Sequence, residues 1–127
     1  MNRSRDHASA LAAALGGPIT VIDWSRRSAA LDGAALVVNA TSLGMTGQPP
    51  LDLALDALPK TAIVNDIVYA PLETPLLSMA RRRGNPVVDG LGMLLHQARP
   101  AFAAWFGVTP EVTPALRQAV AASLVAR

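Results

Sequence analysis

The sequence contains no cysteine, a single lysine and few aromatic side chains. The absence of cysteine excludes a disulfide scaffold, a thiolate metal site and a cysteine nucleophile. Because aromatic residues make up only 4% of the chain, the core must be built from alanine, leucine and valine. The net charge is +2, and the arginines stand in short groups rather than in a long basic stripe. This distribution predicts no nucleic-acid-binding surface.

Long apolar runs are also missing from the sequence. No stretch approaches the about 18 apolar residues of a membrane span, and residues 1–6 lack the apolar run of a signal peptide. We therefore expect a cytoplasmic chain with no membrane partner. The length of 127 residues is enough for one domain, and a hydrophobic fraction of 51% argues against disorder.

Strand-like and helix-like segments alternate along the chain. Strands are predicted at residues 19–24, 35–40, 62–68 and 86–89, and helices begin near Arg5, at Thr74-Pro75, at Leu91 and at Thr113-Pro114. This order favours a parallel α/β layer. The continuous apolar run at 35–40 predicts a strand covered on both faces. Pro100 is expected to kink or split its helix.

Local signals mark the ends of several helices. Ser4 and Thr74 are predicted N-caps, and Pro75 suits a first helical position because it needs no N–H there. Gly84 is expected to end the second helix. Gly16-Gly17 is followed by proline and a strand pattern, so we find no Gly-x-Gly-x-x-Gly turn of the kind that opens a dinucleotide-binding fold.

The first candidate site stands directly before the first helix. Asn2, Arg3 and Ser4 offer an amide, a guanidinium and a hydroxyl beside the free N–H groups of a helix start. Together these groups would bind an anion such as the 2′-phosphate of NADP. The plain alternative is a solvated N-terminal tail.

Two further candidate segments follow predicted strands. Ligands bind at the carboxyl ends of parallel strands, where the hydroxyls of Thr41 and Ser42 could reach a ribose or a phosphate. The hydroxyl of Tyr69, after the next strand, would lie near the same crevice. The alternatives are an ordinary turn at 39–45 and a half-buried tyrosine whose hydroxyl contacts water.

The fourth candidate segment joins the last predicted strand to a helix. Gly90 and Gly92 would let the backbone approach a flat ring closely, and Met93 could pack beside that ring. Gln97 lies four residues after Met93 on the same helix face, where its amide could bond a substrate hydroxyl or carbonyl. Gln97 alone would otherwise be a surface glutamine, and we assign no role to His96.

Taken in order, these four segments resemble shikimate dehydrogenases. That family carries the elements Asn-Arg-Thr-x-x-Arg/Lys, Asn-Ala-Thr-Ser-x-Gly-Met, Asp-x-x-Tyr-x-Pro-x-x-Thr-Pro-Leu/Phe-Leu and Asp-Gly-Leu-Gly-Met-Leu-x-x-Gln-Ala. The likeness runs from Asn2 to about Val120. It implies a partial Rossmann-like parallel sheet with flanking helices and C-terminal helices, with residues 1–127 forming the C-terminal part of an NADP-binding domain.

The resemblance also implies roles for individual residues. The family reduces 3-dehydroshikimate to shikimate with NADPH in aromatic amino-acid biosynthesis. The implied cofactor-binding residues are Asn2, Arg3, Ser4, Thr41, Ser42, Ile67, Gly90 and Met93, and the implied substrate-binding residues are Tyr69 and Gln97. The second basic residue of the family's first element falls at His7, which leaves the preference for NADP over NAD open.

The larger departure concerns the catalytic residues. The family's lysine and aspartate pair belongs to a substrate domain that precedes this segment, and neither has a matching position here, so we assign no catalytic residue or metal ligand. In the strand order 3-2-1-4-5-6, the chain would supply strands 3 to 6 and leave a hole in the sheet. We expect a truncated chain that is inactive alone and is marginally stable, rearranged, or completed by self-association or by a companion chain.

Two other interpretations stay open. The chain could be a non-enzymatic nucleotide-binding or interaction remnant that kept the same fold. It could also be a relative that acts on quinate or uses NAD.

Overall fold

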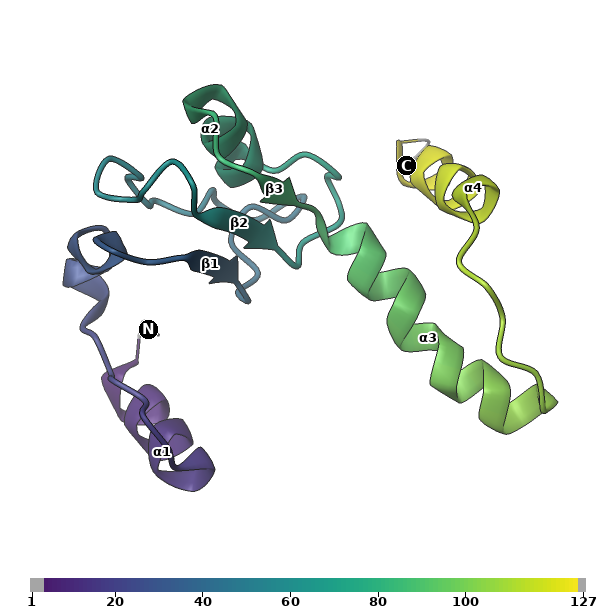
Figure 1. Cartoon of the computed structure of the whole chain (residues 1–127), viewed down its shortest axis with the longest axis horizontal. Helices are drawn as coiled ribbons and strands as arrows, with labels where there is room; N and C mark the ends of the chain where they lie inside the picture. The colour runs from purple at the N-terminus through teal and green to yellow at the C-terminus, as the bar shows by residue number, and fades with distance from the viewer. Residues whose placement is uncertain (1–3, 126–127) are drawn as a thin grey trace. The chain divides into compact units, whose positions relative to one another are not determined.

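The computed structural model describes residues 4–125 and has the expected α/β class (Figure 1). The elements are α1 (Arg5–Leu15), η1 (Trp24–Arg26), η2 (Ala29–Leu31), β1 (Leu36–Asn39), β2 (Ile63–Asp66), α2 (Pro75–Arg83), β3 (Val87–Val88), α3 (Gly90–Phe106) and α4 (Pro114–Val125). The chain divides into two compact units, of which the first comprises Met1–Ala35 and Leu53–Pro59 and the second comprises Leu36–Asp52 and Lys60–Arg127. No helix within residues 4–125 has the length and apolarity needed to cross a bilayer.

The second unit contains a continuous three-stranded parallel sheet in the order β1-β2-β3. The predicted strand at 19–24 is wrong, because residues 19–23 lie outside any strand and Trp24 begins a short 3-10 helix. A strand is stable only when it pairs with another, and no described strand pairs with this segment. The expected sheet of four strands with a hole is therefore also wrong.

Helix α2 packs against β2 and β3 and covers one face of this sheet (Figure 1). Val64 and Asp66 point toward that face and are fully buried, as are Leu77 and Ala80 of the helix. Side chains alternate along a strand and registered partners share a face, so Leu36 and its partner Ile63 point the other way.

The prediction that residues 35–40 are covered on both faces is wrong. Leu36 is 55% exposed and Val38 is 49% exposed, and both lie on the face opposite α2. A parallel sheet buries both faces only when helices pack on each of them. In this unit α2 supplies one such layer, so the apolar run of β1 is buried on one side.

The predicted helix ends are confirmed. The Ser4 hydroxyl accepts from the His7 N–H at 3.4 Å, and the Thr74 hydroxyl accepts from the Leu77 N–H at 3.3 Å. Pro75 occupies the first turn of α2, and Gly84 ends it in the left-handed conformation at φ 87°. These features depend on neighbouring residues alone, which explains why the sequence predicts them.

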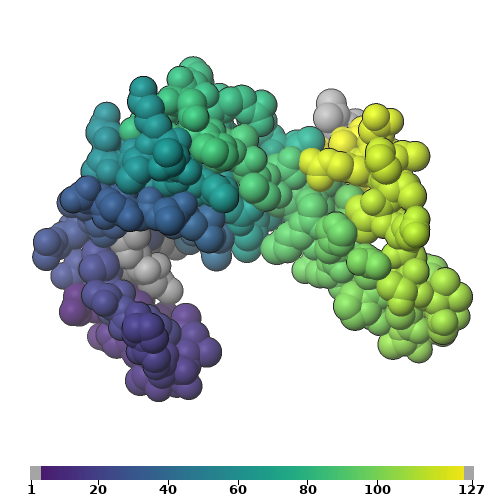
Figure 2. Space-filling view, in the orientation of Figure 1, coloured from purple at the N-terminus to yellow at the C-terminus, as the bar shows by residue number. Residues whose placement is uncertain are grey.

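Helix α3 runs from Gly90 to Phe106 with Pro100 inside it, so the proline does not split the helix. Proline removes one helical hydrogen bond and costs about 3 kcal/mol, which the neighbouring bonds of a long helix can offset. Helix α4 packs beside α3 (Figure 2). Two contacts tie this pair together: Arg117 Nη2 lies 2.6 Å from Asp89 Oδ2, and Arg99 Nε donates to the Pro110 carbonyl at 2.8 Å.

Candidate functional site

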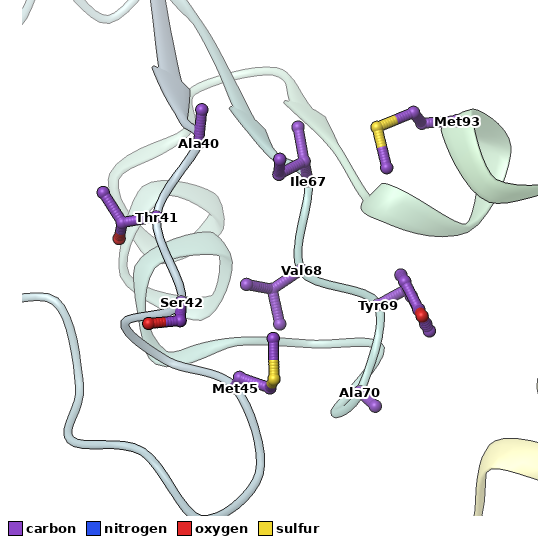
Figure 3. Close-up of a pocket in the computed structure, with 9 residues that line it drawn as sticks. All are labelled: Ala40, Thr41, Ser42, Met45, Ile67, Val68, Tyr69, Ala70 and Met93. Atoms are coloured by element: carbon purple, nitrogen blue, oxygen red, sulfur yellow. The ribbon is translucent and has the colours of Figure 1, made fainter. Parts of the chain in front are cut away.

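The second unit contains a cavity of about 310 Å³ at the carboxyl ends of β1 and β2 (Figure 3). Residues 40–42 and 45 contribute from the segment after β1, residues 67–70 from the segment after β2, and Met93 from α3. Parallel neighbouring strands end at the same edge of a sheet, so the two segments meet there. The cavity lies where the sequence places three of its four candidate segments.

Backbone hydrogen bonds hold the two segments against each other. The Ile67 N–H donates to the Asn39 carbonyl at 3.1 Å, and the Thr46 N–H donates to the Ala70 carbonyl at 2.8 Å. Gly44 adopts φ 91° in the turn of the first segment, a conformation that favours glycine. The segments after β1 and β2 form the two walls of the cavity. These bonds hold the two walls together near both ends of the first segment.

The cavity walls are mainly apolar. Figure 3 shows Met45 and Val68 pointing toward one another, with Ile67 and Met93 above them. The Ser42 hydroxyl points away from Val68 in the same view. The Thr41 hydroxyl is engaged within its own segment, because it donates to Asn39 Oδ1 at 2.7 Å and accepts from the Leu43 N–H at 3.1 Å.

Gly90 determines how closely α3 approaches this site. A Cβ atom at position 90 would lie 2.2 Å from the Ile67 carbonyl oxygen and 2.6 Å from that of Val68. Only glycine allows this contact, and the contact brings Met93, less than one turn later, to the cavity wall. Gly90 itself does not line the cavity.

The sequence analysis missed a buried polar network beneath the cavity. Asn39 and Asp66 are the last residues of β1 and β2 and are partners in the register. Their side chains, with that of Thr74, are buried and hydrogen-bonded to one another. The available signal was an asparagine and an aspartate, each ending an apolar strand run.

The structure brings together five of the predicted site residues at one cavity. Thr41, Ser42, Ile67, Tyr69 and Met93 all line the cavity. Tyr69 is half-buried, whereas Gln97 is exposed and does not line it. Ser4 caps α1 in the other unit. Asn2 and Arg3 lie outside the described residues.

A parallel sheet with packed helices and a crevice at the carboxyl ends of its strands defines a Rossmann-like α/β protein. The family described as Shikimate 5'-dehydrogenase C-terminal domain matches residues 90–121. The shikimate dehydrogenase (NADP(+)) of Paramagnetospirillum magneticum is 65% identical over 116 residues, which are 91% of this chain and 42% of that protein. That of Rhodospirillum rubrum is 61% identical over 124 residues, covering 94% of this chain and 44% of that protein.

Two solved structures of related dehydrogenases also match this chain. Shikimate 5-dehydrogenase from Thermus thermophilus, in complex with NADP(H) and shikimate, matches with a TM-score of 0.76 and 31% identity over 97% of this chain and 44% of that one. Quinate dehydrogenase from Corynebacterium glutamicum, in complex with NAD, matches with a TM-score of 0.74 and 35% identity over 87% of this chain and 39% of that one.

This chain is similar in sequence to part of shikimate dehydrogenases, and the family model that matches residues 90–121 describes their C-terminal domain. The resemblance found in the sequence and the Rossmann-like fold that it implied are both confirmed. The chain spans less than half the length of the curated relatives that it matches, between 42% and 44% for those named above.

Proposed function

We propose that residues 1–127 form the C-terminal part of the NADP-binding domain of a shikimate dehydrogenase. The whole protein would reduce 3-dehydroshikimate to shikimate with NADPH. The observation that carries this proposal is the cavity at the carboxyl ends of β1 and β2, which is lined by the segments that match the family's elements. The 65% identity to a shikimate dehydrogenase over 116 residues supports it.

The cavity suits the nicotinamide end of NADP. Its apolar walls fit the faces of a flat ring, and a volume of about 310 Å³ is at the small end for ligand sites. The cavity therefore fits one ring-sized part of the dinucleotide rather than all of it. When bound, NADPH supplies the hydride, while the chain's own residues bind the ring, orient it and exclude water.

The residues around the cavity receive distinct roles in this proposal. Ile67 and Met93 contact the nicotinamide ring, and Gly90 sets their spacing by its close contact with the Ile67 carbonyl. Thr41 and Ser42 line the cofactor side of the cavity. For the substrate, the half-buried Tyr69 and the exposed Gln97 offer a hydroxyl and an amide that can bond shikimate hydroxyls.

The adenosine 2′-phosphate is assigned to Asn2, Arg3 and Ser4. This assignment rests on the resemblance and on the place of these residues at the N-terminal end of α1, which begins at Arg5. The Arg3→Ala variant should weaken NADP binding and leave NAD binding unchanged, because NAD lacks the 2′-phosphate. Equal weakening of both would contradict the assignment.

A second candidate is the use of NAD with quinate. The likeness to quinate dehydrogenase with NAD supports it, as does His7 in place of the family's second basic residue. The two candidates differ in which cofactor binds more tightly to the wild-type chain, so parallel titrations with NADP and NAD distinguish them.

Catalysis requires residues that have no match in this sequence. Because no residue among the 127 matches the family's catalytic lysine and aspartate, we expect no turnover of shikimate with NADP by this chain alone. The lysine and the aspartate would have to come from outside these 127 residues. Turnover by the purified chain would contradict this expectation. The cytoplasmic location also stays a prediction, which fractionation of cells tests.

The decisive experiment is calorimetric titration of the purified chain with NADP, and separately with shikimate. We expect NADP to bind, and the Met93→Glu variant to bind NADPH, whose nicotinamide ring is uncharged, roughly tenfold or more weakly than the wild type, because the carboxylate loses water when the ring packs against it. The matched control Val108→Glu changes an exposed residue outside the cavity and should leave the affinity unchanged. Absence of NADP binding to the wild-type chain would overturn the proposal.

A further inference from the structure

Three polar side chains are buried beneath the cavity and are not part of its wall. Asn39 is 3% exposed, and Asp66 and Thr74 are fully buried. Asn39 ends β1, Asp66 ends β2 and Thr74 is the N-cap of α2. The three residues therefore connect two strands and a helix at the edge of the sheet where the cavity lies.

Asp66 accepts hydrogen bonds on both carboxyl oxygens. Oδ1 accepts from Asn39 Nδ2 and from the Val68 N–H, each at 3.0 Å, and Oδ2 accepts from the Thr74 hydroxyl at 2.7 Å. The donors in these bonds are neutral. Because burial of a carboxyl group is unfavourable unless hydrogen bonds replace water, the positions of all three donors are narrowly set.

The Asn39 amide uses its full hydrogen-bonding capacity. Nδ2 donates to Asp66 and to the Leu43 carbonyl at 3.0 Å, and Oδ1 accepts from the N–H and the hydroxyl of Thr41 at 3.1 and 2.7 Å. An amide has two N–H donors and two acceptor lone pairs, so nothing remains unpaired. One side chain thus fixes the start of the segment 40–45.

The network reaches both walls of the cavity through backbone atoms. It holds Thr41 and Leu43 in the first wall through Asn39, and it holds Val68 in the second wall through Asp66. The Thr74 hydroxyl also accepts from the Leu77 N–H, which couples the carboxylate to α2. Every link therefore ends on a segment that forms the site or on the helix that supports the sheet.

We propose that Asp66, with Asn39 and Thr74, positions the two cavity walls for ligand binding. This proposal rests on the proposed function, since it concerns the same cavity. Apolar residues of similar shape could fill the same space, because replacing both partners of a buried hydrogen bond by apolar groups can be nearly neutral for stability. What apolar residues could not reproduce is the simultaneous hydrogen bonding of the Thr41, Leu43 and Val68 backbone.

The test compares Thr74→Val with Thr74→Ser in the full chain. Valine has nearly the shape of threonine but leaves Asp66 Oδ2 without its donor, whereas serine keeps the hydroxyl. Amide hydrogen exchange, followed by NMR, is read at Thr41, Leu43 and Val68 and at the reference amide of Val64, which donates to the Pro86 carbonyl within the sheet.

We expect exchange at Thr41, Leu43 and Val68 to become roughly tenfold faster in Thr74→Val, the effect of leaving one oxygen of a buried carboxyl group without its donor. Exchange at Val64 should stay unchanged, and Thr74→Ser should match the wild type. A common acceleration of all four amides would mean a general loss of stability and would overturn the proposal, as would no change at the three wall amides. Should Thr74→Val fail to fold, Asn39→Leu keeps a similar size, removes the bonds to Thr41 and Leu43, and must accelerate exchange at those two amides while leaving Val64 unchanged.

The second readout is NADPH affinity. We expect Thr74→Val to bind NADPH roughly tenfold more weakly, through displacement of the walls, and Thr74→Ser to bind as the wild type does. Unchanged affinity in Thr74→Val would overturn the proposal. If the wild-type chain binds no NADPH, the proposed function fails, and the exchange pattern still decides whether the network positions the walls.

Discussion

The two faces of the three-stranded sheet differ sharply in packing. On one face α2 buries Val64 and Leu77, and the polar network beneath it is fully hydrogen-bonded. On the other face, Leu36, Val38, Ile63 and Val88 are between 41% and 55% exposed. The strands have similar apolar composition on both sides, so the neighbouring helix, and not the strand sequence, makes one face a core.

The largest effect on stability should come from truncating a side chain on the face of the sheet that α2 covers. Leu77→Ala should reduce the free energy of unfolding by about 2–5 kcal/mol, since Leu77 is buried and its loss leaves a cavity. The matched variant Leu36→Ala should change it by less than about 0.5 kcal/mol. Urea denaturation measures both. Similar losses for the two variants would mean that the open face is covered in solution.

Two glycines at the start of α3 also differ in how tightly they are packed. A Cβ atom at Gly90 would overlap the Ile67 carbonyl, whereas one at Gly92 would meet nothing within 4 Å. Gly90→Ala should therefore destabilise the fold by about 1–3 kcal/mol, as overpacking does. Gly92→Ala should stabilise it by about 0.5–1 kcal/mol, because alanine loses less entropy in a helix. A neutral Gly90→Ala would show that α3 is not held against Ile67.

The smallest effect on stability is expected on the open face of the edge strand β1. Val38→Lys should change the free energy of unfolding by no more than about 0.5 kcal/mol, because Val38 is about half exposed. The same variant tests the predicted self-association, since a charge on this face would oppose burial against another copy. Sedimentation of the wild type should show a concentration-dependent mass that Val38→Lys lowers. A wild type that is monomeric at all concentrations would contradict self-association.

The candidate site was predicted in part. Thr41, Ser42, Ile67, Tyr69 and Met93 were identified from their places at strand ends and from the resemblance, and they do line one cavity. The roles of these residues stay predictions. The network of Asn39, Asp66 and Thr74 was missed because its bonds join residues 8 and 27 positions apart, and local patterns carry no sign of such pairs.

What the sequence by itself determined were features with a short range. Ser4 and Thr74 cap their helices, and Gly84 ends α2, because each needs only atoms within a few residues. Tertiary structure alone decided that residues 19–24 form no strand and that β1 is buried on one face. Both outcomes depend on whether another strand or helix packs alongside. The sequence of an apolar run does not show whether that neighbour is present.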